Sequence, residues 1–150
     1  MNKNHRKILV VDDSPISQKI TQKFLETSGY EVFEAWDGKE CFEKVEKEKP
    51  DAILMDVILP DINGKDIVKQ LQNDPLTKDI PVIFATNTLD LNIDDGNASI
   101  EVEGRIYRAF AKPIHSKKLL SVIRKEINRR RSGGQLPEKV ISKKAKPQVN

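Results

Sequence analysis

Short apolar runs alternate along the chain with segments whose apolar residues recur at helical spacing. The runs over residues 7–11, 52–55 and 80–85 are bounded by turn or charged residues, which is typical of strands buried on both faces. Residues 105–111 are predicted to form another strand, which closes at Lys112 and Pro113. A looser alternation over residues 30–35 predicts a further strand at or near the edge of the sheet.

Helical segments follow most of these strands. Ser14 and Pro15 predict a helix start, and we expect that helix to bury a stripe formed by Ile16, Ile20, Phe24 and Leu25. Three more helices are predicted over 38–49, over 64–73 and from a cap at Ser116. This alternation predicts an α/β fold with a parallel sheet and helices on both of its faces.

The segment 87–104 breaks the alternation. It is rich in Asn, Asp, Ser, Thr and Gly, and it holds five acidic residues and no basic one. We therefore expect residues 88–104 to form a mobile acidic loop in place of a fourth helix, with room for a short hairpin or one helical turn.

Charged and hydroxyl side chains stand where the predicted strands end. Asp12 and Asp13 follow the first strand, Asp56 follows the central one, and Thr86 and Lys112 close two others. The carboxyl ends of parallel strands share one edge, so these side chains should converge. Grouped carboxylates favour a hard cation such as Mg²⁺, and an Asp carboxylate can accept a phosphoryl group.

Four segments carry a resemblance to a known family. VVDDS at 10–14, MDVILPDINGKD at 55–66, FAT at 84–86 and KPI at 112–114 resemble, in order and spacing, the signatures of two-component response regulator receiver domains, closest in layout to the single-domain chemotaxis type. The resemblance covers residues 6–128. It implies a flavodoxin-like, doubly wound sheet of five parallel strands in the order 2-1-3-4-5.

The resemblance also implies roles for the strand-end residues. Asp56 would accept the phosphoryl group from a sensor histidine kinase or a phosphotransfer protein, with Thr86 and Lys112 contacting the group. Asp12, Asp13, Asp56 and the backbone carbonyl of Ile58 would organise Mg²⁺. Catalysis would be limited to phosphorylation and dephosphorylation of the chain itself, which would signal through an output protein or relay the phosphate.

Three features depart from the family pattern. Asn87 replaces the small residue that usually follows the switch threonine. Ala109 stands where a switch aromatic is usual, and strand alternation places Tyr107 on the same side of the strand as Ala109 and Phe110 on the other side. The third departure is the predicted loop in place of the fourth helix. These features favour an altered output surface.

Other functions fit the same residues less well. A haloacid-dehalogenase-type phosphatase would need an Asp two residues after Asp56, where this chain has Ile58. A flavodoxin-type electron carrier would need a phosphate-binding loop where Asp12 and Asp13 would repel the flavin phosphate. The serious alternative is a pseudo-receiver, an interaction module that is never phosphorylated.

Composition divides the chain into two parts. The whole chain of 150 residues has a net charge of +3, but residues 129–150 contain seven Lys or Arg and one Glu, which leaves 1–128 with a net charge of −3. We expect a receiver domain over 1–128 and a disordered basic tail over 129–150, with nucleic-acid or membrane contact by the tail as the less favoured alternative. Absence of a signal peptide or membrane-length apolar run predicts a cytoplasmic protein.

Overall fold

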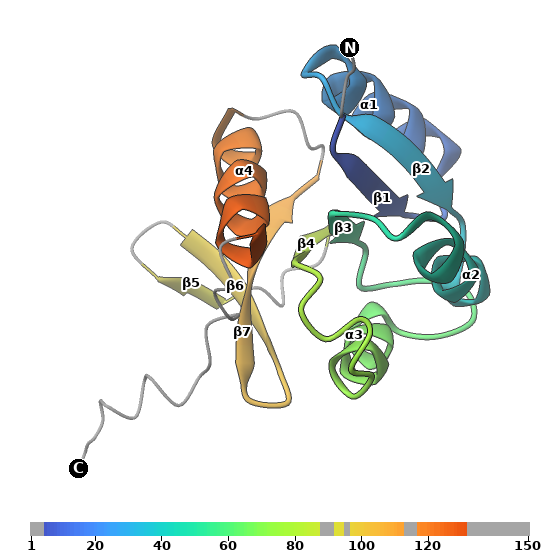
Figure 1. The fold of residues 1–150 in the computed structure, drawn as a ribbon, viewed down its shortest axis with the longest axis vertical. Helices are drawn as coiled ribbons and strands as arrows, with labels where there is room; N and C mark the ends of the chain where they lie inside the picture. Colours follow the sequence, from blue (N-terminus) through green and yellow to red (C-terminus); the bar gives the residue numbers. More distant parts are fainter. Residues whose placement is uncertain (1–4, 88–91, 95–96, 113–116, 132–150) are drawn as a thin grey trace.

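The computed structural model describes residues 5–87, 92–94, 97–112 and 117–131 (Figure 1). Four helices and seven strands lie within these ranges. In chain order they are β1 (Lys7–Val11), α1 (Pro15–Thr27), β2 (Glu31–Ala35), α2 (Gly38–Glu48), β3 (Ala52–Met55), α3 (Gly64–Gln72), β4 (Val82–Thr86), β5 (Asn92–Asp94), β6 (Asn97–Val102), β7 (Arg105–Ala111) and α4 (Lys117–Arg131).

All strands belong to one sheet, in the order β2-β1-β3-β4-β7-β6-β5. The first five of these are parallel neighbours, and they reproduce the predicted five-stranded parallel sheet, with β2 at its edge. Strands β6 and β5 continue the sheet beyond β7 in antiparallel pairing. The fold is therefore the predicted doubly wound α/β fold, extended at one edge.

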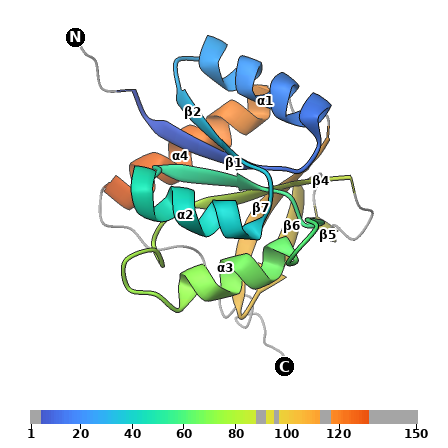
Figure 2. The ribbon, with the colours of Figure 1, turned by 90° about the vertical axis from the view of Figure 1, so that its right-hand side faces the viewer.

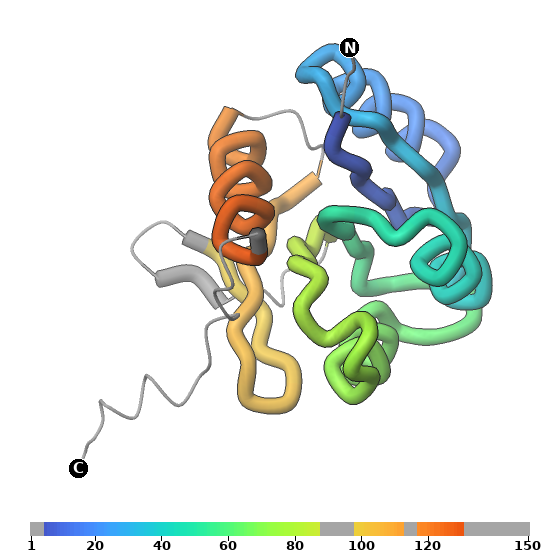
Figure 3. The backbone as a smooth tube through the Cα atoms, viewed as in Figure 1, coloured from blue at the N-terminus to red at the C-terminus, as the bar shows by residue number. Residues whose placement is uncertain are grey.

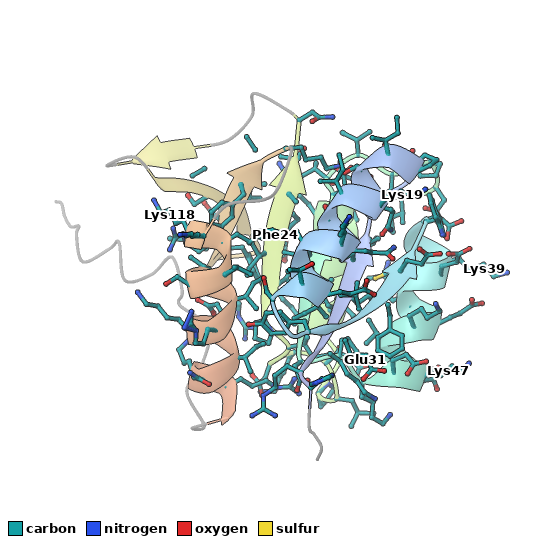
Figure 4. All side chains as sticks on the ribbon, turned by 90° about the horizontal axis from the view of Figure 1, so that it is seen from above. Lys19, Phe24, Glu31, Lys39, Lys47 and Lys118 are labelled. Atoms are coloured by element: carbon teal, nitrogen blue, oxygen red, sulfur yellow. The ribbon has the colours of Figure 1, made fainter. Side chains whose placement is uncertain are left out.

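Helices cover both faces of the parallel sheet (Figure 2). Residues of α2 and α3, including Val45 and Ile67, share one buried cluster with the sheet. Residues of α1 and α4, including Leu25 and Ile123, share the other. Phe24 packs against this second cluster and lies between α1 and α4 in Figure 4. Within the described ranges, no helix combines the length and apolar character needed to cross a membrane.

The buried face of α1 differs from the predicted stripe. Ile16 and Ile20 are 73% and 42% exposed, whereas Gln18, Thr21 and Leu25 are buried. The predicted burial is confirmed for Leu25, and Phe24 packs against the core, but the prediction was wrong for Ile16 and Ile20 because it ranked the helix faces by apolarity alone. The first turns of α1 pass over the ends of β1 and β2, where a donor side chain is needed for backbone carbonyls, and Gln18 supplies it.

The predicted acidic loop is replaced, in its described part, by strands β5 and β6. Ala98, Ile100 and Val102 alternate with polar residues, and the side chains of Ile100 and Val102 are buried in the cluster shared with α3. Glu103 and Gly104 form the turn into β7 with positive φ angles, and the hairpin that results extends below α4 in Figure 3. Residues 88–91 and 95–96 of the expected loop lie outside the described residues.

Tyr107 and Phe110 lie on opposite sides of β7, as predicted. Tyr107 and Ala109 belong to the cluster shared with α3, and Phe110 packs against the other cluster. Tyr107 contacts the ring of Phe84 edge to face with centroids 5.8 Å apart, and its hydroxyl accepts a hydrogen bond from Gln72 of α3. Gln72 also donates to the carbonyl of Val102, so one side chain joins α3 to the hairpin.

We expect Tyr107→Phe to lower the free energy of unfolding by about 1 kcal/mol, because it removes a buried hydrogen bond between α3 and β7. Urea denaturation measures the change. Tyr30→Phe is the matched control, since the hydroxyl of Tyr30 has no hydrogen bond within the described part of the chain. Equal losses in the two variants would contradict this account of the hairpin.

Candidate functional site

The strand-end residues predicted from the sequence meet at the carboxyl edge of the sheet. Asp12 follows β1, Asp56 follows β3, Thr86 ends β4 and Lys112 follows β7. Backbone hydrogen bonds fix these ends, because Asp56 N donates to Val11 O at 3.0 Å and Lys112 N donates to Thr86 O at 3.1 Å. The sheet register therefore sets the site, and the predicted convergence is confirmed.

Lys112 connects two of the carboxylates. Its Nζ lies 2.6 Å from Asp56 Oδ2 and 2.7 Å from Asp12 Oδ2. All three side chains are less than a tenth exposed, with values of 8% for Lys112, 4% for Asp12 and 9% for Asp56. Burial acts to lower the pKa of Lys112, but hydrogen bonds to Asp12 and Asp56 raise it above its usual value. The ammonium group is therefore held in its charged form between two acids.

Asp13 completes an acidic cluster. One carboxylate oxygen from each of Asp12, Asp13 and Asp56 lies within 4.8 Å of the others, and Asp13 is exposed whereas the other two are buried. A cavity of about 290 Å³ opens beside them, and its walls include Asp13, Asp56, Ile58, Thr86, Asn87 and Lys112. An all-oxygen donor set with access for water fits the coordination that Mg²⁺ prefers.

The loop after Asp56 is anchored by tight contacts. A Cβ added at Gly64 would lie 2.1 Å from the backbone oxygen of Asp56, so the loop can pass there only with glycine. Asp61 accepts hydrogen bonds from Gly38 N and Lys39 N at the start of α2, and the bond from Gly38 holds its pKa below the usual range. The segment from 56 to 64 is thus held by the close approach of Gly64 to Asp56 and by the hydrogen bonds of Asp61.

Asp12 is held by the predicted helix cap Ser14 and by two residues that the sequence did not single out, Ser17 and Gln18. Ser17 Oγ donates to Asp12 Oδ2, and Ser14 N donates to Asp12 Oδ1 at 3.0 Å. Gln18 Nε2 donates to the backbone carbonyl of Asp12 at 3.1 Å. Gln18 is one of several polar residues in a helix that mixes polar and apolar residues, so the sequence gives little sign of its role.

The environment of Asp56 predicts a pH dependence of stability. Burial raises the pKa of Asp56, and the hydrogen bond from Lys112 only partly offsets this effect. The folded state therefore binds this proton more tightly than the unfolded state does, and stability falls as the pH rises from about 4 through the raised pKa. In the absence of Mg²⁺, we expect Asp56→Asn to be more stable than the wild type at pH 7, with the gain vanishing toward acid pH.

Urea denaturation across pH measures this difference, with Asp66→Asn on the exposed start of α3 as the control. An Asp56→Asn variant that is less stable than the wild type at every pH would mean that the bond to Lys112 outweighs the cost of burying the carboxylate.

Comparison with known proteins assigns the family. The response regulator receiver domain family matches residues 8–124, which include every residue of the site. The chain belongs to this family. The class expected from its motifs is therefore confirmed.

Individual relatives differ in how much of their length is shared. Protein PilH of Pseudomonas aeruginosa is 36% identical over 120 residues, which cover 78% of this chain and 93% of PilH. The alkaline phosphatase synthesis transcriptional regulatory protein PhoP of Bacillus subtilis is 44% identical over 82 residues, which cover 55% of this chain and 33% of PhoP. The chain thus spans about a third of the length of PhoP but nearly all of PilH.

Solved structures of the family share the fold. A CheY-like response regulator receiver domain protein from Methanospirillum hungatei has a TM-score of 0.69 at 25% identity, covering 87% of this chain and 100% of that one. The receiver domain of sensor histidine kinase PA1611 from Pseudomonas aeruginosa has a TM-score of 0.67 at 26% identity, covering 83% of this chain and 99% of that one. That structure holds a magnesium ion coordinated in its active site cleft.

Proposed function

We propose that Asp56 accepts a phosphoryl group from a phosphohistidine of a sensor histidine kinase or phosphotransfer protein. The observation that carries this proposal is the position of Asp56: it lines the cavity and contacts Lys112 at 2.6 Å. Asp13 lines the same cavity but is not one of the acids that pair with Lys112. Asp12 pairs with Lys112 but is not among the residues that line the cavity. Asp56 alone combines access to the cavity with the cation.

The residues around Asp56 suit an in-line transfer. A carboxylate oxygen of Asp56 attacks phosphorus, the P–N bond of the phosphohistidine breaks, and the imidazole leaves with the bonding electron pair. Lys112 then contacts an oxygen of the bound phosphoryl group, and the Thr86 hydroxyl in the cavity wall contacts another. Thr86 ends β4, the strand next to the one that carries Asp56, and Lys112 follows β7, one strand further on. The Nζ of Lys112 already lies 2.6 Å from Asp56 Oδ2, so it needs little movement to reach the group.

Asp12, Asp13, Asp56 and the Ile58 carbonyl would hold Mg²⁺. When bound, this ion neutralises negative charge on the transferred group and on the carboxylates around it. Asp13 is the exposed member of the cluster and leaves room for water on the ion. The magnesium-containing structure of the PA1611 receiver domain supports the same choice of metal.

The surface around the cavity suits a protein donor. Ile16, Ile20 and Ile58 are 73%, 42% and 62% exposed, and Ile58 lines the cavity of Asp56 while Ile16 and Ile20 line the adjoining one beside Lys112. Apolar side chains exposed around a charged site favour contact with an apolar protein surface.

We place the protein in the cytoplasm, where it would turn over no external substrate and would catalyse only its own phosphorylation and dephosphorylation.

The direct test is phosphorylation of the purified chain by a small phosphodonor. We expect intact mass spectrometry to show the gain of one acid-labile phosphoryl group in the presence of Mg²⁺, and no gain when the metal is chelated. A chain that takes up no phosphoryl group under either condition would be a pseudo-receiver, and its function would be protein interaction alone.

A further inference from the structure

Gln18 is a buried polar residue with an unusual set of contacts. It is 1% exposed, and its Nε2 lies 3.0 Å from Val10 O, 3.1 Å from Asp12 O and 3.0 Å from Ala35 O. These carbonyls belong to the ends of β1 and β2 and to the first residue of the site. A carboxamide has two N–H hydrogens, so three carbonyls share them. The amide group therefore ties the helix α1 to both strand ends at once.

The oxygen of the same side chain continues the connection outward. Gln18 Oε1 accepts a hydrogen bond from Gln22 Nε2 at 3.0 Å, and Gln22 Nε2 also donates to Glu34 Oε1 at 2.6 Å. Glu34 Oε2 accepts from the indole Nε1 of Trp36 at 3.2 Å. A continuous hydrogen-bonded chain thus leads from the backbone of Asp12 to the only tryptophan of the protein.

We propose that Gln18 is a positioning residue for the acidic site, and that its hydrogen-bonded chain makes Trp36 responsive to occupation of that site. The proposal rests on the proposed function, because it concerns the same Mg²⁺ and phosphoryl site. Gln18 holds the carbonyl of Asp12, and Asp12 N donates to Ala35 O, so the peptide units on both sides of the Asp12 Cα are fixed. This fixes the starting direction of the chain that carries Asp13.

Packing alone does not account for this arrangement. Thr21 and Leu25 are buried on the same face of α1, and within the described part of the chain neither side chain forms a hydrogen bond to β1. This face of the helix can therefore be buried against the sheet without a side chain that reaches the strand ends. A buried amide is costly unless all its polar atoms are paired. The side-chain amide of Gln18 donates only to backbone carbonyls of the site and of the neighbouring strand ends. Residues that orient metal ligands from behind typically change metal affinity 10-fold to 100-fold when replaced.

The test compares Mg²⁺ binding in Gln18→Met and Thr21→Val. Met keeps the length of the side chain without its donors, and Thr21→Val changes an equally buried polar residue one turn along α1. We expect the dissociation constant for Mg²⁺, from amide chemical shifts, to rise about tenfold in Gln18→Met and less than twofold in Thr21→Val. At saturating Mg²⁺, the phosphorylation rate of Gln18→Met should stay within about threefold of the wild-type rate.

Outcomes against the proposal are distinct. Equal Mg²⁺ constants in the two variants, or a rate loss in Gln18→Met that saturating Mg²⁺ does not restore, would show a merely structural role. A wild-type chain that binds Mg²⁺ but gains no phosphoryl group would refute the proposed function, and the Mg²⁺ constants would still decide the role of Gln18.

Two further measurements do not depend on the folding of Gln18→Met. In the wild type, the side-chain amide resonances of Gln18 should shift with Mg²⁺ along the same binding curve as the backbone amide of Asp13. Trp36 fluorescence should follow that curve too, and Gln22→Leu should abolish the fluorescence response while changing the Mg²⁺ constant less than twofold. Unmoved Gln18 resonances would overturn the positioning role, and an unchanged fluorescence response in Gln22→Leu would overturn the connection to Trp36.

Discussion

Asp56→Asn is expected to abolish the acid-labile mass gain that the wild type shows with a small phosphodonor and Mg²⁺. Asn keeps the shape of the side chain, but its amide is a very poor nucleophile toward phosphorus. Asp12 is not among the residues that line the cavity, and Asp13 lines it without being one of the two acids paired with Lys112, so neither carboxylate replaces Asp56. Intact mass spectrometry over a time course measures the change, and the expected effect is complete loss.

Two matched variants define the meaning of that loss. Asp13→Asn keeps the acceptor and removes one oxygen from the acidic cluster, so we expect slow phosphorylation that higher Mg²⁺ partly restores. Asp66→Asn changes an exposed acid at the start of α3, away from the cavity, and should behave as the wild type. Phosphorylation of Asp56→Asn at the wild-type rate would assign the phosphoryl group to another residue.

The sequence was sufficient to predict the parallel sheet and the meeting of its strand-end residues. β1, β3 and β4 are short apolar runs, and the residue at the end of a parallel strand lies at the carboxyl edge whatever the details of packing. Asp12, Asp56, Thr86 and Lys112 could therefore be placed together before any coordinates. Which acids Lys112 contacts could not be predicted in this way, because it depends on side-chain conformation, and the structure shows a contact to Asp12 beside the one to Asp56.

The face of α1 was predicted wrongly because apolarity is not the only property that decides burial. Ile16 and Ile20 are exposed beside the site, where an apolar surface suits a partner, while the buried position is taken by Gln18. A buried glutamine is favourable only when particular carbonyls await its donors, and those carbonyls belong to β1 and β2. Contacts between distant segments of this kind leave no periodic signal in the sequence.

The predicted loop left room for a short hairpin, but the extension of the sheet by β6 and β5 was not predicted, for a related reason. Glu101 and Glu103 suggested a solvated loop, yet strand β6 places Glu101 on one side and buries Ile100 and Val102 on the other. Local composition favoured a loop, and burial of the alternate side chains against α3 overrode it. Tyr107 of β7 is buried in the same cluster and accepts a hydrogen bond from Gln72, so the hairpin and α3 hold this aromatic side chain in place.

Lys112→Met is expected to lower the free energy of unfolding by about 3 kcal/mol at neutral pH without Mg²⁺. The substitution leaves the carboxylates of Asp12 and Asp56 buried, adjacent and without their cation, since the three side chains are 8%, 4% and 9% exposed. Removing one partner of such a buried group costs far more than the intact group contributes, because the remaining charges are left unpaired in a poorly solvated place. Urea denaturation at pH 7 measures the loss.

Lys78→Met is the matched control, because Lys78 pairs with Asp79 at 3.3 Å while both side chains are nearly half exposed. Loss of such a surface pair should change the free energy of unfolding by less than about 1 kcal/mol.

Mg²⁺ should stabilise Lys112→Met more than the wild type, because the unpaired carboxylates then bind the added cation with less competition. Lowering the pH should also reduce the deficit, since burial raises the pKa of Asp56 and a protonated Asp56 no longer repels Asp12. A loss in free energy of unfolding as small as that of Lys78→Met, and independent of Mg²⁺ and pH, would show that Lys112 does not neutralise the two carboxylates. It would also contradict the proposed contact of Lys112 with the phosphoryl group.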